Sequence, residues 1–310
     1  MLPGLSTGEG RLVSASALDG RVRAVVLDGG PVVETMRRAH DTEPAVTAAL
    51  GRTVLGALLL ASQLKKDDHV VTLRVDGGGP AGTLLVTATG AGTVRGLAGR
   101  PRPGIEQVND EGKLNVSGAV GRTGTLSVVR DLGLGRPYGS TVELVSGEVG
   151  EDLAHYLARS EQVRSAVGVG VFVSEDGSVD SAGGYLVQLL GGLNDEDVEQ
   201  LERRIRALPH PTVMLLNGER PEHILSRMFG DDWVHGGDRR VSFHCPCTRD
   251  RAERALVLLG EETLLELMDE ARIVGATEVN CEFCGDSFDF DADRLEALLG
   301  DLRASRTGGG

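Results

Sequence analysis

The stretches FHCPCTR at residues 243–249 and CEFCG at residues 281–285 contain all four cysteines of the chain. Cys245 and Cys247 form one pair, Cys281 and Cys284 form the other, and no cysteine precedes them. Four thiolates that converge on one point match the needs of a tetrahedral Zn²⁺ site. The same four sulfurs could instead close two local disulfides. These two stretches therefore predict either a zinc site or a redox switch, and they are the most informative part of the sequence.

Three interpretations of these cysteines remain open from their spacing alone. A Cys₄ zinc site most often serves as a structural staple for a small domain. A regulatory zinc site is the second interpretation, and a metal-free CxxC redox pair is the third. The CxC spacing is tighter than the usual C-x₂₋₄-C of zinc ribbons and fingers. A disulfide between residues i and i+2 is hard to close without strain, and strained disulfides are typically labile and regulatory.

The residues around the CxxC pair favour metal binding over thiol catalysis. A catalytic cysteine needs a lowered pKa, which a helix N-terminus or nearby cations provide. Here the neighbours are acidic, namely Glu278, Glu282, Asp286 and Asp289. These carboxylates disfavour a thiolate unless a metal compensates, so the local charge indicates zinc ligation. His244 adjoins Cys245, but four cysteines already fill a tetrahedral site.

The composition indicates a folded protein of about two domains without an affinity for nucleic acid. The chain has 310 residues, of which 40% are hydrophobic and only 3% aromatic. Its formal net charge of −14 argues against nucleic acid and against an anionic membrane surface as partners. Residues 1–10 do not have the pattern of a secretory signal, and the longest apolar run, 53–64, is too short to span a bilayer. We therefore expect a cytoplasmic protein, in which clustered cysteines serve as metal ligands or redox groups.

Patterns along the chain predict an α+β fold with a largely antiparallel sheet in the N-terminal part. Alternating residues and turn signals predict a hairpin or meander at 11–34, and helical spacing predicts helices at 42–66 and 148–166. Glycine-rich breaks separate several short strands between these helices. We expect four regions: an N-terminal α+β core domain, a helical linker, a C-terminal Cys₄ zinc domain and a flexible tail. Their predicted bounds are 1–185, 190–240, 241–300 and 301–310.

The region 190–240 has few apolar anchors for its length, which predicts that it folds only by docking onto another surface. Residues 194–208 form a charged amphipathic helix with Leu201, Ile205 and Leu208 on one stripe. Asp231 to Arg240 is rich in glycine and charge and is interpreted as a flexible joint. The zinc domain that follows is too small to be stable without a staple, so loss of zinc should unfold it.

No motif for nucleotide binding or for nucleophilic catalysis was found. The glycine-rich segment at 76–82 does not fit a P-loop and joins two strands, which favours a plain loop. No G-x-S-x-G elbow is present. The sequence thus predicts a protein that is not an enzyme and that works without ATP.

The chain resembles the 33 kDa chaperonin family, the redox-regulated heat-shock holdases, over nearly its whole length. In the cysteine domain the resemblance rests on the two stretches quoted above. In the N-terminal part it rests on His40, Ala48–Arg52, Val94–Gly96, Tyr138–Gly139, Glu151–Leu153, Tyr156, Ser160–Gln162 and Ala182–Gln188. Together these motifs are highly specific, whereas the CxC and CxxC pattern alone is only moderately so.

The resemblance implies a redox mechanism for protection against oxidative and heat stress. In reduced family members the four cysteines, here Cys245, Cys247, Cys281 and Cys284, bind one Zn²⁺ as thiolates, and the protein is a poor chaperone. Oxidation releases zinc and pairs neighbours, here Cys245 with Cys247 and Cys281 with Cys284. The zinc domain unfolds, the linker loses its docking partner, and the protein dimerises and holds unfolding clients without ATP.

Two other functions compete with this interpretation. A thiol-disulfide oxidoreductase would use the CxxC pair and would need a low pKa at Cys281. A zinc-ribbon adaptor or nucleic-acid module is disfavoured by the charge and by the large N-terminal domain. For a holdase, the stripe of Leu201, Ile205 and Leu208 is a candidate client-binding surface, although these residues could simply pack on the N-terminal domain.

Overall fold

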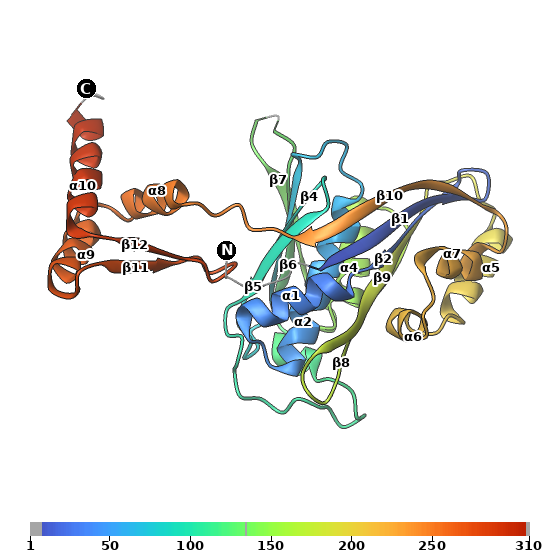
Figure 1. Cartoon of the computed structure of the whole chain (residues 1–310). Helices are drawn as coiled ribbons and strands as arrows, with labels where there is room; N and C mark the ends of the chain where they lie inside the picture. Colours follow the sequence, from blue (N-terminus) through green and yellow to red (C-terminus); the bar gives the residue numbers. More distant parts are fainter. Residues whose placement is uncertain (1–7, 134, 308–310) are drawn as a thin grey trace. The chain divides into compact units, whose positions relative to one another are not determined.

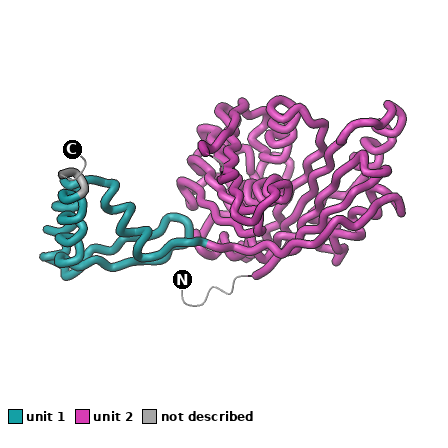
Figure 2. Tube along the Cα trace, turned by 90° about the horizontal axis from the view of Figure 1, so that it is seen from above, with its two compact units in different colours: residues 1–4, 245–310 teal, residues 5–244 magenta. Residues whose placement is uncertain are grey.

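A computed structural model describes residues 8–133 and 135–307, and these divide into two compact units (Figure 1, Figure 2). The larger unit extends to His244, and we call it the sheet unit. The smaller unit begins at Cys245 and contains all four cysteines, and we call it the cysteine unit. The predicted linker, residues 190–240, belongs to the sheet unit, and its redox-sensitive role remains a prediction.

The sheet unit is built on one ten-stranded sheet with the order β7-β6-β3-β4-β5-β10-β1-β2-β9-β8. Neighbouring strands are antiparallel except β5 and β10, which are parallel. The strands are β1 (Glu9–Ala17), β2 (Val22–Asp28), β3 (Val70–Asp76), β4 (Leu84–Thr89), β5 (Thr93–Ala98), β6 (Thr125–Asp131), β7 (Tyr138–Glu143), β8 (Ser165–Val173), β9 (Val179–Leu189) and β10 (Trp233–Phe243). With the helices around this sheet, the predicted α+β fold with a largely antiparallel sheet is confirmed.

Strand β10 joins the two halves of this sheet. It pairs with β1 from Ser242 to Trp233, with one register shift between Ser14 and Ala15. Its contact with β5 is much shorter, because only Ser242 and Phe243 pair there. The link between the two halves therefore lies at the end of β10 that precedes the first cysteine.

Helices cover both faces of the sheet. In β2, Val25 and Val26 are both almost fully buried, and successive side chains of a strand point to opposite faces. Such burial requires a cover on each side, which α1 and α2 provide on one face and α5 to α7 on the other (Figure 1). The helical segments of this unit are α1 (Gly30–His40), α2 (Pro44–Ala61), α3 (Val116–Val120), α4 (Gly150–Tyr156), the π-helical η1 (Leu157–Glu161), α5 (Asp195–Arg206), α6 (Pro211–Leu216) and α7 (Pro221–Phe229).

Helix α2 is the central helix of the larger core. Apolar side chains occur on all its sides, with Arg52 as its one charged residue, and nearly all of them are buried, including Leu55 and Leu58. Pro44 begins it at a position that needs no hydrogen-bond donor. By length and composition α2 could also cross a membrane, but 89% of its apolar window is buried inside the protein. Such burial is typical of the core helix of a globular domain.

Helices α5 to α7 pack on β1, β2 and β9 through one apolar cluster. The cluster contains Met214 from α6, Ile224 and Phe229 from α7, and Leu201 from α5. The apolar side chains of this region are therefore buried both against one another and against the sheet. The expectation that the region folds only by docking remains a prediction.

The cysteine unit has a small core of its own. Its elements are α8 (Arg249–Leu259), α9 (Glu261–Val274), β11 (Thr277–Asn280), β12 (Ser287–Phe290) and α10 (Ala292–Thr307), and β11 pairs with β12. Leucines of the three helices surround Phe290, which is fully buried. The Arg249 guanidinium lies over the ring of Phe290, 4.5 Å from its centre.

Three sequence-based expectations about local structure were wrong. Residues 30–34 were assigned to a hairpin, but they begin α1. The segment 231–240 was interpreted as a flexible joint, but β10 begins at Trp233. The tail at 301–310 was expected to be flexible, but α10 continues to Thr307, and residues 308–310 lie outside the described part of the chain.

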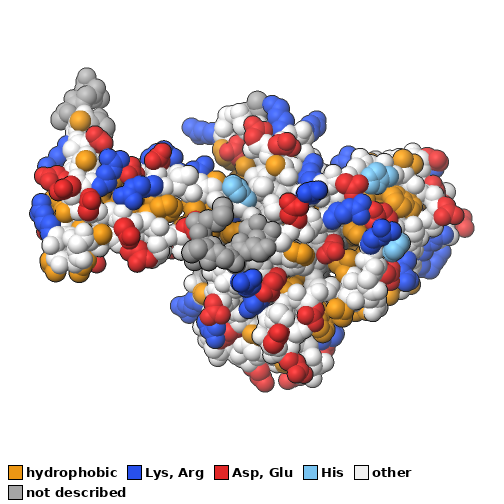
Figure 3. Space-filling view, in the orientation of Figure 1, with side chains coloured by type: hydrophobic (Ala, Val, Ile, Leu, Met, Phe, Trp, Pro, Cys, Tyr) orange, Lys and Arg blue, Asp and Glu red, His pale blue; other side chains and the backbone are white. Residues whose placement is uncertain are grey.

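Acidic and basic side chains are intermixed over the face of the protein in Figure 3, with hydrophobic side chains between them. No single large basic area stands out on that face. The mixed charges on this face agree with a protein of net charge −14, and the absence of a nucleic-acid partner remains a prediction.

Candidate metal centre

Cys245 and Cys247 lie in the short connection between β10 and α8. The connection is held at both ends, because His244 N donates to Val94 O of β5 at 3.0 Å and Thr248 caps α8. The Thr248 hydroxyl accepts a hydrogen bond from Arg251 N at 3.3 Å, which satisfies a free donor of the first helical turn. Between these anchors, residues 244–248 have no regular secondary structure, and Thr248 itself has an extended backbone.

Cys281 and Cys284 lie in the turn that joins β11 and β12. Gly285 N donates to Cys281 O at 2.7 Å, and Cys281 N donates to Asp286 O at 2.9 Å. Gly285 has a φ of 74°, in the left-handed region that glycine adopts without strain. The turn is therefore fixed by its own backbone bonds and brings both sulfurs to the same end of the hairpin.

The four sulfurs converge on one point. All four Sγ atoms lie within 4.8 Å of one another, and no disulfide joins the four cysteines. Across the pairs, Cys245 Sγ is 3.7 Å from Cys281 Sγ, and Cys247 Sγ is 3.2 Å from Cys284 Sγ. Zn–S bonds of about 2.3 Å in a tetrahedron place sulfurs about 3.8 Å apart. The four cysteines therefore fit a tetrahedral metal ion, as the spacing predicted.

Burial and charge at this cluster oppose free thiolates. Cys284 is buried, and the other three cysteines are half-buried. Burial raises the pKa of the Cys247 thiol to about 11, and it also raises the pKa of Cys284. The carboxylate Oδ2 of Asp286 lies 3.6 Å from Cys247 Sγ, so the surroundings add negative charge. A bound cation is what would make thiolates favourable here, whereas a catalytic thiol needs a lowered pKa.

His244 is not part of this cluster. It is exposed, and its backbone is bonded to β5. Among the described residues, the group that could hold a metal ion consists of the four cysteines alone. The site therefore has the donor set expected from the sequence, without a fifth ligand.

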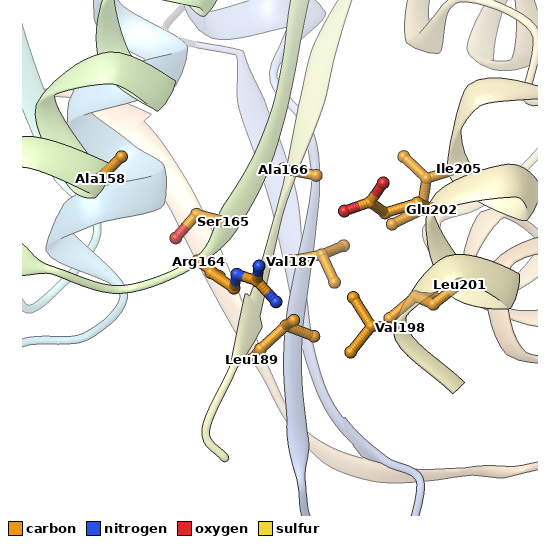
Figure 4. A pocket seen from close by; sticks show the side chains of 10 residues that line it. All are labelled: Ala158, Arg164, Ser165, Ala166, Val187, Leu189, Val198, Leu201, Glu202 and Ile205. Atoms are coloured by element: carbon orange, nitrogen blue, oxygen red, sulfur yellow. The ribbon is translucent and has the colours of Figure 1, made fainter. Parts of the chain in front are cut away.

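The proposed client-binding residues pack against the sheet in this structure. Leu201 is 5% exposed, and Ile205 and Leu208 are partly buried against the same cluster. A groove of about 250 Å³ nevertheless remains between α5 and strands β8 and β9. Figure 4 shows Leu201 and Ile205 beside this groove, facing the strand that carries Val187. In this state the three residues cover the sheet, and their contact with clients remains a prediction.

Several motif residues that carried the family resemblance prove to have structural roles. The carboxylate of Asp152 is fully buried and accepts hydrogen bonds from the backbone N–H groups of Val145, Ser146 and Val149. It thereby fixes the turn that begins α4. Sequence reasoning placed Asp152 in a motif but gave no reason for its presence.

Sequence reasoning also missed a half-buried ion pair beside η1. Arg130 Nη2 of β6 lies 2.6 Å from Glu161 Oε1, and Arg130 Nη1 donates to the Tyr156 hydroxyl at 3.3 Å. Burial raises the pKa of Tyr156. The motif containing Glu161 was visible in the sequence, but its cationic partner lies on a separate strand and could not be assigned by spacing.

Comparisons with known proteins agree with the resemblance noted from the motifs. A family model described as Hsp33 protein matches residues 10–291. The 33 kDa chaperonin of Levilactobacillus brevis is 40% identical over 94% of this chain and 98% of its own. That of Aquifex aeolicus is 44% identical over 89% of this chain and 85% of its own. The crystal structure of the 33 kDa chaperonin of Thermotoga maritima matches with a TM-score of 0.85 and 36% identity, over 95% of this chain and 99% of that one.

Proposed function

This chain belongs to the Hsp33 family of chaperones, and from that premise we propose that it is a redox-switched holdase that works without ATP. It binds unfolded or partly unfolded proteins and keeps them from aggregating under oxidative and heat stress. The observation that carries the redox part of this proposal is the convergence of four cysteine sulfurs within 4.8 Å of one another. We further propose that the protein is cytoplasmic and has no enzymatic activity.

In the reduced state, Cys245, Cys247, Cys281 and Cys284 hold one Zn²⁺ as thiolates. When bound, Zn²⁺ supplies the positive charge that offsets four sulfur anions in this half-buried, acidic site. The two cysteine pairs come from distant parts of the cysteine unit, so their joint ligation ties the β10–α8 connection to the β11–β12 turn. The small leucine core of this unit then needs less apolar burial to remain folded.

Oxidation pairs each cysteine with its near neighbour in sequence. One peroxide accepts two electrons from the thiolates of Cys245 and Cys247 and two protons from the solvent, so that the two sulfurs form a disulfide and the peroxide becomes two molecules of water. A second peroxide oxidises Cys281 and Cys284 in the same way. A disulfide sulfur is no longer a thiolate, so the four ligands that held the metal are lost.

Disulfides within each segment leave the β10–α8 connection and the β11–β12 turn without a link to each other. The short contacts in the structure join Cys245 to Cys281 and Cys247 to Cys284, across the two segments. Crosswise disulfides would keep these segments linked and would preserve the fold of the unit. Disulfides within each segment leave no bond between them, so the unit loses its staple and unfolds.

The end of β10 transmits this change along the chain. Residues Ser242 and Phe243 join the two halves of the sheet and lie immediately before the first cysteine pair. Loss of order after Cys245 removes the anchor that follows this short contact. Helices α5 to α7, which lead into β10, then loosen from the sheet, starting with α5 and the unfilled groove beneath it. The apolar side chains thus uncovered bind clients, and the activated protein dimerises.

Zinc release and aggregation should be measured on the same sample. The reduced protein is purified, its zinc is counted, and it is treated with peroxide at elevated temperature before addition of a thermally unfolding client without ATP. We expect one zinc per chain, its loss on oxidation, and suppression of aggregation that reductant and zinc reverse. Zinc that stays bound, or that leaves without a gain of activity, would mean that the site is only structural. Catalytic turnover in a disulfide-exchange assay would instead favour an oxidoreductase.

A further inference from the structure

We infer that the outer edge of strand β8 binds an extended segment of an unfolded client, which joins the sheet as one more strand. This inference rests on the proposed holdase function and names the surface and the mode of binding. Strand β8 is the last strand of the ten-stranded sheet, and within the described residues β9 is the only strand that pairs with it. Its outer side therefore presents backbone groups that have no strand partner.

The register shows which backbone groups of β8 point outward. Leu189 N donates to Arg164 O at 3.0 Å, so these two residues form a hydrogen-bonded antiparallel pair. Such pairs alternate with pairs whose N–H and C=O groups point away from the neighbouring strand. The residues bonded to β9 are accordingly Ala166, Gly168 and Gly170. The residues with outward-facing backbone groups are Ser165, Val167, Val169 and Val171.

The sequence of β8 does not protect this edge. Proteins usually guard an edge strand against further pairing with charges, prolines or bulges. The outward-facing stretch SAVGVGV of β8 contains no charge and no proline. The opposite edge strand, β7, is shorter, its side chains are mostly exposed, and it ends with Glu143. Of the two edges of one sheet, β8 is the one suited to receive another strand.

A cleft runs along the unprotected edge. It has a volume of about 990 Å³, and residues 166–169 of β8 form one of its walls. Gly150 and Ala154 of α4 and residues 208–211 line it elsewhere. At Val169 the beginning of α4 lies close to the strand, because a β-carbon at Gly150 would lie 3.3 Å from Val169 Cγ2 and 4.0 Å from its backbone nitrogen. The cleft therefore reaches the edge at residues 166–168, which are half-buried, whereas α4 covers the edge at Val169, which is buried.

The chemistry of the cleft favours a polypeptide over an ionic ligand. Its charged side chains have both signs in nearly equal number: Arg52 lies 2.5 Å from Glu148 and Lys113 lies 2.9 Å from Glu111. Arg122, Arg206 and Glu151 also line the cleft, so it has no strong excess of one charge. The backbone donors and acceptors of β8 can be matched by any extended chain regardless of its side chains. Recognition without sequence preference is what a holdase requires.

The segment 205–211 lies beside this edge, so its release after oxidation would make the edge more accessible. Ile205 and residues 208–211 line the cleft, and the His210 ring lies directly against the backbone of Gly170. A side chain at Gly170 would collide with this ring, so the contact depends on the glycine. When α5 and α6 loosen after oxidation, His210 leaves β8 and the cleft widens for a client.

The first test compares two peptides on the oxidised, full-length protein. One is an apolar, strand-forming peptide, and the other has the same side chains but N-methyl groups on alternate backbone nitrogens. We expect the methylated peptide to bind at least about fivefold more weakly, as loss of one backbone hydrogen bond predicts. Equal affinity, or no binding of either peptide, overturns the inference. The proposed function stands in both cases as long as the same sample suppresses aggregation.

Hydrogen exchange locates the bound strand. On peptide binding, we expect the outward-facing amides of Ser165 and Val167 to exchange at least about tenfold more slowly, while Gly168, already bonded to β9, changes little. No added protection at Ser165 and Val167 would overturn the inference. Protection that appears on oxidation alone, before any peptide is added, would assign the edge to a second copy of the chain and also overturn it.

A matched pair of proline variants tests the edge in the aggregation assay. Proline at an outward-facing position of an edge strand removes a donor that the sheet does not use. Val167→Pro in β8 should weaken client holding about fivefold, whereas Thr141→Pro, outward-facing in β7, should leave it unchanged. Zinc content and thermal unfolding verify that both variants fold. Equal activity of two folded variants contradicts the inference, and if Val167→Pro does not fold, the methylated peptide decides alone.

Discussion

The sheet unit buries long apolar side chains from both faces of ten strands and from α2, whereas the cysteine unit has one small cluster of leucines around Phe290. The first therefore has a core large enough for its fold, and the second depends on four sulfurs held together. In the proposed mechanism, a reagent that reaches sulfur unfolds the cysteine unit and leaves the core of the sheet unit intact. The part that would respond to oxidation is then separate from the part that would bind clients.

Metal removal should have the largest effect, because it should unfold the cysteine unit while the core of the sheet unit stays folded. A chelator added to the reduced protein should unfold residues 245–307, loosen residues 190–244 and leave the core of the sheet unit around α2 folded, because zinc contributes roughly 10–16 kcal/mol in small zinc domains. Residue-resolved hydrogen exchange should show lost protection in α9 and α10 and retained protection in α2. Retained protection in the cysteine unit without metal would show that its leucine core suffices.

Loss of one ligand should have the next largest effect. Cys247→Ser should reduce zinc content and increase protease cleavage in residues 190–244 even under reducing conditions, because three thiolates bind zinc more weakly than four. Thr248→Ser is the matched control, since it keeps the hydroxyl that caps α8. If Cys247→Ser retains full zinc and native protease resistance, the assignment of Cys247 as a ligand is wrong.

A pair of leucines sharpens the contrast between the two units. Leu58 of α2 is 1% exposed and Leu258 of α8 is 87% exposed. Leu58→Ala should lower the free energy of unfolding of the sheet unit by about 3 kcal/mol, and Leu258→Ala should change stability by less than about 0.5 kcal/mol. Denaturant unfolding monitored in each unit measures both effects. A cost for Leu258→Ala similar to that of Leu58→Ala would reveal a contact at α8 that this structure does not contain.

Acidification should have the smallest effect, confined to the segment near His210. Burial lowers the pKa of His210, and the positive charges of Arg52 and Lys113 lower it further. The fold therefore favours neutral His210. Its contribution to stability is present above the ordinary histidine pKa of about 6.5 and is lost as the pH falls below that value. Protease sensitivity near residues 206–212 should therefore rise between pH 7 and pH 5. The His210→Asn variant should lack this pH dependence, and an identical profile in the variant would exclude His210 as its cause.

The metal centre was predictable because its signal is local. The spacing of Cys245, Cys247, Cys281 and Cys284 is visible in the sequence, and their convergence needs only that two short connections meet. The α+β class and helix α2 were predictable for a similar reason, since periodicity reports burial within one element. The disulfide pairing and the identity of the metal came from the family resemblance and remain proposals.

The missed elements depend on partners far away in the chain. Strand β10 carries glycine and charged residues through Asp238 and Arg240, and many of its side chains are exposed, so its own sequence resembles a loop. It becomes a strand because β1, from the other end of the sheet unit, offers a long edge for pairing. Helix α1 was missed because Gly29, Gly30 and Pro31 resemble a turn, although proline is common in the first turn of a helix.

The position of β10 in the middle of the sheet also sets the order in which the protein can be completed during synthesis. Until Phe243 has left the ribosome, the strands from β7 to β5 and those from β8 to β1 form two separate half-sheets, each with an open edge. Strand β10, the last strand of this sheet to be made, fills the gap between them, and the first cysteine pair follows at once. A nascent chain is therefore most exposed to wrong pairing just before its redox centre exists.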